Sequence, residues 1–406
     1  MRFIVIGITD SRKPFFSPEV LSVIREGKVF SGGKRHYGIV APFLPREAQW
    51  IDITVPLSDV FGKYRNPSLF EGGTGTYIVF ASGDPLFYGF ANTLQREFPE
   101  AELQVFPAFN SLQMLAHRMR IAYQDMHVVS LTGRPWDQLD RALICGYPLI
   151  GCLTDRNKTP HSIRQHMAEY GYDNYMMTVG ENLGNDTLER VGPYDAGTDY
   201  ANPNCVILRQ TGVRQLPFGI PDSQFALLDD RQKMITKMPI RLLTLQALEL
   251  RNRHVFWDIG FCTGSVSIEA RLQFPHLQIE AFEVRPECEA IIRRNARRFG
   301  APGIHVHMCD FLEIPLPMDE KAGMRPPDAV FIGGHGGRLR DMMRRVLTVL
   351  APGGMIVMNS VVAPRVTTDS RQLWDQACAE LGLKQETPTR IQLDNHHPIT
   401  ILRCRR

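Results

Sequence analysis

The chain has 406 residues, of which 44% are hydrophobic and 22% charged. This balance is typical of a soluble globular protein, and the length exceeds what one ordinary hydrophobic core accommodates. The formal charge of +3 is too small to indicate binding to nucleic acid, and no stretch approaches the ~18 apolar residues that span a membrane. Eight cysteines without a Cys-x-x-Cys pair indicate reduced thiols, so we expect a cytoplasmic protein of two domains.

The first half of the chain alternates short apolar strands with helices. Ser17-Pro18-Glu19 predicts a helix start, because it combines a cap, a first-turn proline and an acid facing the helix dipole. Strands are expected at 3–8, 77–81, 105–108, 128–131 and 149–153, and helices at 87–98, 110–119, 136–145 and 160–170. Later strands at 176–179, 188–191 and 205–208 follow one another without helices. We therefore predict an α/β domain over residues 1–211 that ends in antiparallel strands.

A segment rich in glycine and proline, 212–224, is the predicted linker to a second domain over residues 225–406. Strands are expected there at 254–259, 278–283, 304–309, 328–332 and 354–359, and helices at 236–252, 264–273, 286–299, 337–350 and 366–382. Such an alternation predicts a mostly parallel, Rossmann-like sheet covered on both faces. Two closing strands, 384–393 and 399–403, are expected to form an antiparallel hairpin at its edge.

The most informative motif of the second domain is a turn that joins a strand to a helix. In a doubly wound sheet, ligands bind beyond the carboxyl ends of the strands. Gly260 and Gly264 let the backbone of this turn approach a ligand, and Asp258 precedes them. Glu283 ends the next strand, where an acid accepts hydrogen bonds from ribose hydroxyls, and Asp310 ends the third strand, in reach of an adenine amino group. The set predicts an adenosine ligand.

Two adenosine ligands fit this pattern to different degrees. A dinucleotide requires Gly-x-Gly-x-x-Gly, so that its pyrophosphate sits at the helix N-terminus, but this chain has Cys262 and Ser265 at the second and third glycine positions. S-adenosyl-L-methionine carries no phosphate and needs a floor for its amino-acid end together with acids for ribose and adenine. The sequence favours S-adenosylmethionine, and a dinucleotide-dependent oxidoreductase is the alternative.

Several segments resemble a known family. The segment 258–269, Asp-Ile-Gly-Phe-Cys-Thr-Gly-Ser-Val-Ser-Ile-Glu, with Ile-Thr-Lys at 235–237 and Pro-Asp-Ala-Val-Phe-Ile-Gly-Gly at 327–334, resembles the CbiT class of corrin methyltransferases. Ser-Gly-Asp-Pro-Leu-Phe-Tyr-Gly at 82–89 and Val-Gly-Glu-Asn-Leu-Gly at 179–184 resemble the CbiE class of tetrapyrrole methylases. This order is similar to that of the fused precorrin-6Y methyltransferases of cobalamin biosynthesis.

The resemblance implies a reaction and a substrate. It implies methylation of a precorrin-type tetrapyrrole at ring carbons 5 and 15, with loss of carbon dioxide from the acetate on ring C. The CbiT-like half would carry out the decarboxylation with one methylation, and the CbiE-like half the other. The resemblance also implies a homo-oligomer, and it matches these residues to contacts of S-adenosylmethionine: Thr236, Gly260, Gly264 and Glu283 directly, Asp310 beside another contact, and Gly83, Asp84 and Ser111 in the first domain.

Two departures from the family pattern bear on function. Cys262 stands within the predicted cofactor turn where the family usually has glycine. The glycine-rich turn expected after the first strand, which normally borders the ring-binding cleft, is replaced by Thr-Asp-Ser-Arg-Lys-Pro at 9–14. A further alternative is therefore a tetrapyrrole-binding protein in which only the C-terminal site is active.

Catalysis of methyl transfer requires mainly alignment, so no nucleophilic side chain is expected. In the glycine-rich loop 333–338, we predict that Arg338 pairs with a substrate carboxylate and that His335 carries a proton. His305, His307 and Cys309 alternate along one strand, as metal ligands could, but no fourth ligand is evident and we predict no metal site.

Overall fold

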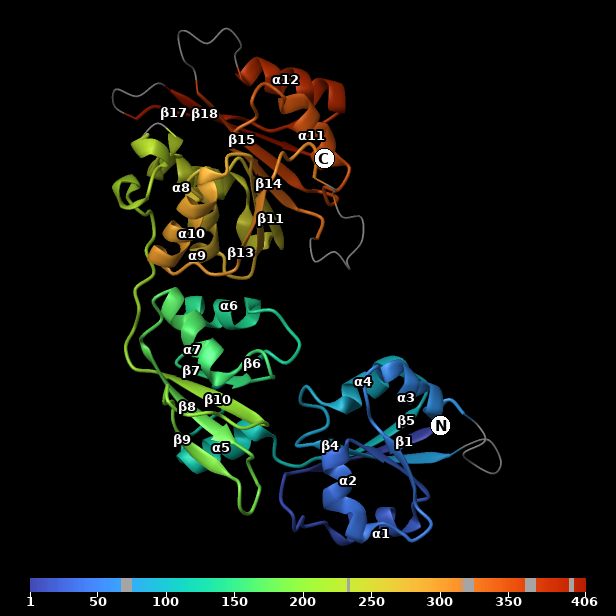
Figure 1. The fold of residues 1–406 in the computed structure, drawn as a ribbon. Helices are drawn as coiled ribbons and strands as arrows, with labels where there is room; N and C mark the ends of the chain where they lie inside the picture. Colours follow the sequence, from blue (N-terminus) through green and yellow to red (C-terminus); the bar gives the residue numbers. More distant parts are fainter. Residues whose placement is uncertain (67–74, 232–233, 315, 317–324, 362–369, 394–397) are drawn as a thin grey trace. The chain divides into compact units, whose positions relative to one another are not determined.

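The computed structural model describes residues 1–66, 75–231, 234–314, 316, 325–361, 370–393 and 398–406 (Figure 1). By their internal contacts the residues divide into two compact units. Unit 1 comprises Met1–Gln138, Tyr147–Gln165 and Asn174–Gly212. Unit 2 comprises Leu139–Gly146, His166–Asp173 and Val213–Arg406. No helix in these described ranges is long and apolar enough to cross a membrane.

The first sheet of unit 1 is parallel throughout, with strand order β3-β2-β4-β1-β5. Its elements are β1 (Arg2–Ile8), α1 (Pro18–Glu26), β2 (Val29–Gly32), α2 (Lys34–Val40), β3 (Gln49–Asp52), α3 (Leu57–Tyr64), β4 (Thr76–Ser82), α4 (Phe90–Glu97) and β5 (Glu102–Phe106). Apolar side chains of α1 and α2 pack on one face of the sheet, and those of α3 and α4 pack on the other.

Local signals explain where two of these helices begin. The predicted start of α1 is confirmed, because Ser17 Oγ accepts a hydrogen bond from Val20 N at 3.3 Å and Pro18 occupies the first turn. The predicted helix at 87–98 begins only at Phe90, because residues 84–89 form a turn in which Phe87 N donates to the Asp84 carbonyl oxygen.

The second sheet of unit 1 has the order β6-β7-β10-β8-β9. Its segment of chain contains α5 (Ser111–Met119), β6 (His127–Ser130), α6 (Asp137–Cys145), β7 (Leu149–Leu153), α7 (Pro160–Glu169), β8 (Tyr175–Glu181), β9 (Arg190–Pro193) and β10 (Asn204–Gln210). Only β6 and β7 pair in parallel, and β8, β9 and β10 pair antiparallel. The predicted change from α/β to antiparallel structure is confirmed.

Unit 2 contains an eight-stranded sheet with the order β13-β12-β11-β14-β15-β18-β16, in which β17 also pairs with β18. Its elements are α8 (Met238–Ala247), β11 (Val255–Ile259), α9 (Ser265–Gln273), β12 (Gln278–Glu283), α10 (Glu287–Phe299), β13 (Ile304–Met308), β14 (Ala329–Ile332), α11 (Leu339–Leu347), β15 (Met355–Val361), α12 (Ser370–Leu381), β16 (Lys384–Gln385), β17 (Thr389–Ile391) and β18 (Ile399–Arg405).

The strands of the unit 2 sheet agree with their prediction. The strands β11 to β15 are parallel, and the predicted antiparallel hairpin at the edge is confirmed, because β16 and β17 both pair antiparallel with β18, which pairs antiparallel with β15. The predicted helix 236–252 ends early, because Glu249 takes a left-handed conformation with φ 55° and separates α8 from a short 3-10 turn.

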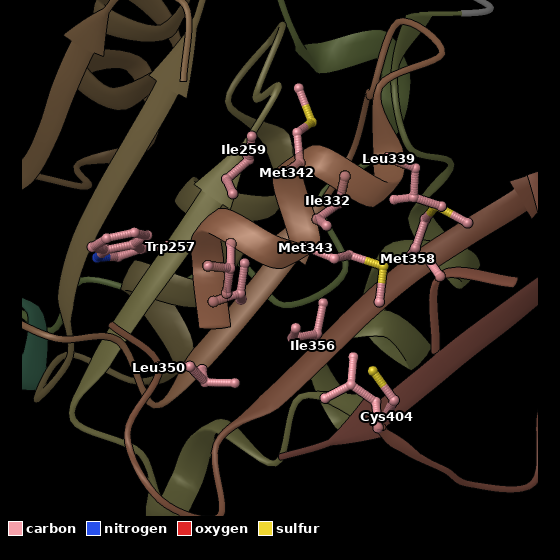
Figure 2. Close-up of a cluster of buried hydrophobic side chains, with 14 of the residues drawn as sticks. Trp257, Ile259, Ile332, Leu339, Met342, Met343, Leu350, Ile356, Met358 and Cys404 are labelled. Carbon is pink, nitrogen blue, oxygen red and sulfur yellow. The ribbon is translucent and has the colours of Figure 1, made fainter. Parts of the chain in front are cut away.

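Helices cover both faces of this sheet. Figure 2 shows the cluster on one face, which contains Leu339, Met342 and Met343 of α11 together with Trp257 and Ile259 of β11. Residues of α8, α9 and α10 pack on the opposite face. Because parallel strands end at one edge, this layering brings the turns after β11, β12, β13 and β14 together.

A buried ion pair fixes the chain in front of α8. Arg241 and Glu269 are both fully buried, and Arg241 Nε lies 3.1 Å from Glu269 Oε2. Glu269 also accepts hydrogen bonds from the backbone N–H groups of Gly219 and Ile220, and Arg241 Nη1 donates to the Thr236 carbonyl oxygen at 2.9 Å. The pair therefore anchors both the segment around Ile220 and the segment that contains Thr236.

We predict that Arg241→Met lowers the free energy of unfolding by about 3–5 kcal/mol, because it leaves the Glu269 carboxylate buried and unpaired. Urea unfolding of the full chain measures the change, with Arg251→Met, at an exposed arginine, as the control. A loss below about 1 kcal/mol, the range of surface pairs, would show that the pair does not hold this segment.

Candidate active sites

The turn after β11 borders a cavity of about 530 Å³ in unit 2, named here the Asp258 cavity. It lies at the carboxyl ends of β11 and β14, where doubly wound sheets bind their ligands. The lining includes Thr236, Asp258, Gly260, Cys262, Arg285 and Gly334. Four of the predicted cofactor-binding residues, Thr236, Asp258, Gly260 and Cys262, therefore share one cavity.

Two backbone turns meet at the floor of the Asp258 cavity. Gly260 has φ +80°, and a Cβ at this position would lie 2.8 Å from Gly334 N, a distance that no side chain tolerates. Gly333 N donates to the Ile259 carbonyl oxygen at 2.8 Å, which ties the turn after β14 to the end of β11. At Gly334 a Cβ would meet no atom within 4 Å, so the backbone on that side faces open space.

Asp258 presents a carboxylate oxygen without a protein partner. Its Oδ2 accepts a hydrogen bond from Ser267 Oγ at 2.6 Å, whereas Oδ1 is buried and has no hydrogen-bond partner among the described residues. Burial raises the pKa of Asp258 to about 7 against the opposing effect of Ser267, and the charge of Glu283 adds to the rise. Since the folded pKa exceeds the unfolded one, ionisation of Asp258 costs stability as the pH rises from about 4 to about 7.

Glu283 lies in a neighbouring cavity of about 330 Å³, the Glu283 cavity, which shares Gly260, Arg285 and Gly334 with the Asp258 cavity. Glu283 Oε2 accepts from Cys262 N at 3.0 Å and from Arg285 Nη2 at 2.6 Å. Burial alone would raise the pKa of Glu283, but hydrogen bonds from Arg285 and from backbone N–H groups hold it below its usual value. The carboxylate is therefore charged and fixed in place.

Asp310, His335 and Arg338 also line the Glu283 cavity. Arg338 Nη2 lies 2.8 Å from Asp310 Oδ2, so the predicted substrate-binding arginine and the predicted adenine-binding acid pair with each other. Backbone donation from Leu312 and this arginine lower the pKa of Asp310. His335 Nδ1 accepts from Gly337 N at 3.1 Å, which assigns the proton of the neutral ring to Nε2, and burial lowers the pKa of His335.

Gly264 and Cys262 have local roles in the turn. Gly264 does not line either cavity among the described residues; a Cβ there would lie 2.3 Å from Ile292 Cγ1, so this glycine permits α9 and α10 to pack. Cys262 has φ 49°, and its side chain is buried against Cys288 and Ile292 in one apolar cluster. Its backbone N–H, rather than its thiol, contacts the carboxylate of Glu283.

The histidines of β13 pair with a buried carboxylate instead of forming a metal trio. His305 Nδ1 and His307 Nε2 lie 2.9 and 2.6 Å from the two oxygens of Glu280. Among the described residues, no group of three His, Cys, Asp or Glu side chains has the arrangement of a metal site.

Unit 1 contains its own cavity of about 440 Å³, the Ser82 cavity, at the carboxyl ends of β1, β2 and β4. Gly83 and Ser111, two of the predicted cofactor-binding residues, line it. Gly83 has φ +62°, and a Cβ there would lie 2.9 Å from Asn110 Cα, so only glycine fits between the turn and α5. Asp84 is not among the described residues that line the cavity; its Oδ1 accepts from Leu86 N at 2.9 Å and stabilises the turn.

The unusual turn at 9–14 is held firmly beside the Ser82 cavity. Asn185 Nδ2 donates to Asp10 Oδ2 at 3.0 Å, and Arg12 N donates to Asp186 Oδ2 at 3.0 Å. Thr9 and Asp10 contribute to the lining. Three residues that were not predicted as site residues, Asp10, Arg35 and Arg285, each line one of the cavities.

Comparison with known proteins gives a consistent set of relatives. Residues 228–404 match the family described as "Precorrin methyltransferase domain". The chain is 33% identical to a protein of Sinorhizobium sp named precorrin-6Y C(5,15)-methyltransferase [decarboxylating], over 93% of this chain and 88% of that one. Two shorter relatives come from Salmonella typhimurium. One, a cobalt-precorrin-6B C(15)-methyltransferase (decarboxylating), is 33% identical over 42% of this chain and 89% of its own. The other, a cobalt-precorrin-7 C(5)-methyltransferase, is 27% identical over 50% of this chain and 97% of its own.

We predict that Gly264→Ala destabilises the chain by about 1–3 kcal/mol more than Gly353→Ala does, because only at Gly264 would the methyl group overlap a neighbour. Gly353 is a matched control, since its φ of +71° is close to the +73° of Gly264 and a Cβ there would meet nothing within 4 Å. Urea unfolding of both variants gives the difference. Equal losses would mean that Gly264 is required for its φ alone.

Proposed function

The chain belongs to the family of precorrin-6Y C(5,15)-methyltransferases (decarboxylating), and we propose that it methylates a precorrin-type ring at carbons 5 and 15 in cobalamin biosynthesis. The same proposal includes loss of carbon dioxide from the acetate on ring C. The observation that carries it is the presence of two separate cavities, one in each unit, each at the carboxyl ends of parallel strands and each bordered by a glycine that no larger residue could replace.

We propose that the two reactions belong to different parts of the chain. The match at 228–404 supports a CbiT-like domain over 225–406, which contains the Asp258 cavity and would carry out decarboxylation and methylation at carbon 15. A CbiE-like domain over 1–211 would methylate carbon 5 at the Ser82 cavity, with 212–224 as the linker. The two shorter relatives support this division, because each is named for one of the two carbons.

The lining of the Asp258 cavity fits S-adenosylmethionine. The partnerless Oδ1 of Asp258 is placed to accept a hydrogen bond from an ammonium group, because a buried acceptor without a partner is costly. The open backbone at Gly334 leaves room for the chain of the methionine, and Glu283 is the acid that would hold the ribose hydroxyls. When bound, this cofactor supplies an activated methyl group. Thr236 is held at the same cavity by Arg241 and would contact the methionine end.

Two other residues of the Glu283 cavity, Arg338 and His335, would serve the macrocycle. Arg338 is half-exposed and could exchange Asp310 for a substrate carboxylate, the bidentate partner that a guanidinium prefers. Decarboxylation breaks the bond between the carboxylate and its carbon, and the electron pair passes into the conjugated ring. A proton from water then replaces the carboxylate on that carbon. Neutral His335 carries its proton on Nε2 and would position that water or the substrate through this N–H group.

We also propose a cellular location and partners for the chain. Eight free cysteines support a reducing, cytoplasmic location, since none of them forms a disulfide. We also propose a homo-oligomer without nucleic-acid or membrane partners, on family membership and on the small net charge.

We predict that S-adenosylhomocysteine, the demethylated cofactor, binds at two sites and that its affinity for one of them increases as the pH rises. A nearby ammonium favours ionised Asp258, so binding releases a proton and affinity increases by up to about tenfold per pH unit below pH 7. Calorimetric titrations of the full chain between about pH 5.5 and about pH 8 measure the effect. In Asp258→Asn, S-adenosylhomocysteine should bind weakly at this site, with an affinity that does not change with pH. If the variant keeps the pH dependence of the unchanged chain, Asp258 does not belong to the site.

We predict that the purified chain, given S-adenosylmethionine and the precorrin substrate, forms a product with two added methyl groups and one lost carbon dioxide, detected by mass spectrometry. A product with a single new methyl group would favour the alternative in which only the C-terminal site is active. A product with no added methyl group and no lost carbon dioxide, formed by hydride transfer with a nicotinamide dinucleotide instead, would contradict the proposed function.

A further inference from the structure

Three strand ends bring four polar side chains together at the Ser82 cavity. Asp10 follows β1, Arg35 and His36 lie in the first turn of α2 after β2, and Ser82 ends β4. All four line the cavity. Their hydrogen bonds determine which of them can accept and which can donate toward a ligand.

The ring of His36 is fixed in one protonation form. His36 Nδ1 accepts from Gly33 N at 3.2 Å, so in the neutral ring the proton is on Nε2. Burial lowers the pKa of His36 to about 4, with the charge of Arg35 in the same direction and Asp10 opposing. Near neutral pH, the Nε2–H group therefore donates to Ser82 Oγ, which lies 2.9 Å away.

The hydroxyl of Ser82 can donate a hydrogen bond to a ligand but has no free lone pair with which to accept one. It accepts from His36 Nε2 and also from Arg35 Nη2, which lies 2.6 Å away. A hydroxyl has two acceptor lone pairs and one proton, so both lone pairs are used and the O–H group remains for a ligand. Ser82 is exposed within the cavity, so this O–H group is accessible.

Arg35 adds positive charge to the same place. Its Nη1 forms an ion pair with Asp10 Oδ1 at 3.3 Å, although this buried oxygen has no hydrogen-bond partner among the described residues, and Asp10 Oδ2 accepts a hydrogen bond from Asn185. Asp10 thus holds the guanidinium from the protein side, whereas 37% of the Arg35 side chain stays exposed. The guanidinium has five N–H groups, and the contacts with Asp10 and Ser82 involve only those on Nη1 and Nη2. Toward the cavity, Ser82 and Arg35 together offer donors only.

We propose that Ser82 and Arg35 form a carboxylate-binding subsite in the cavity of unit 1, with His36 and Asp10 as positioning residues. This inference rests on the proposed function, because the carboxylate belongs either to an acid side chain of the macrocycle or to the methionine end of the cofactor. It also gives the altered turn at 9–14 a role, since that turn supplies Asp10.

The test compares Ser82→Ala and Arg35→Met with the unchanged chain. Methylation at carbon 5 is followed while the precorrin concentration varies, and S-adenosylhomocysteine binding is measured by calorimetry. Because each variant loses a charge-assisted hydrogen bond to the carboxylate, we expect either the KM for the precorrin or the Kd for S-adenosylhomocysteine to rise by about 10- to 100-fold. A rise in KM for the precorrin with kcat within about threefold assigns the carboxylate to the macrocycle, and a rise in Kd for one S-adenosylhomocysteine event assigns it to the cofactor.

Controls separate this role from a structural one. Ser82→Thr keeps the hydroxyl and should restore the constant that Ser82→Ala changes. Arg25→Met, at an exposed arginine of α1, should leave both constants unchanged. The subsite is disproved if KM and Kd in both test variants stay within about twofold of Arg25→Met, or if only kcat falls. The proposed function fails separately if the unchanged chain forms no methylated product.

Discussion

The close approach of two turns at the carboxyl edge of the sheet in unit 2 is the constraint on which this site depends. Gly260 and Gly334 are too near for any side chain at position 260, and the hydrogen bond from Gly333 N to the Ile259 carbonyl oxygen holds them there. This contact lies beside Asp258, which lines the same cavity and whose buried Oδ1 has no hydrogen-bond partner among the described residues. A larger residue at position 260 would separate the turns, because backbone atoms cannot yield as a flexible side chain does.

Unit 1 reaches a comparable arrangement with different residues. Gly83 lies against Asn110 as Gly260 lies against Gly334, and in both units the cavity opens where parallel strands end. Both cavities have a lining carboxylate with one buried oxygen that lacks a hydrogen-bond partner among the described residues, Asp258 Oδ1 in unit 2 and Asp10 Oδ1 in unit 1. The Ser82 cavity differs in that Ser82 and Arg35 add donors beside this carboxylate.

Much of the fold could be predicted from periodicity, and most misses have local causes. The strands β11, β12, β14 and β15 of unit 2 were predictable because each is a buried apolar run that is followed by a turn. The elements β2, α2, β3 and α3 were not predicted; the two strands have four residues each, too few to show a period. The place of β18 beside β15 depends on pairing between distant strands, which sequence spacing does not encode. The site acids were predictable from their positions at strand ends. The pairing of Asp310 with Arg338, and the hydrogen bonds around Ser82, depend on side-chain directions and required the structure.

The central claim is that each unit of the chain holds its own molecule of the methyl donor. A crystal structure of the full chain grown with S-adenosylhomocysteine tests it most directly. We expect one molecule in the Asp258 cavity, with its amino group at Asp258 Oδ1, and a second in the Ser82 cavity. Electron density for the ligand in only one cavity, or at a place remote from both glycine turns, would contradict it.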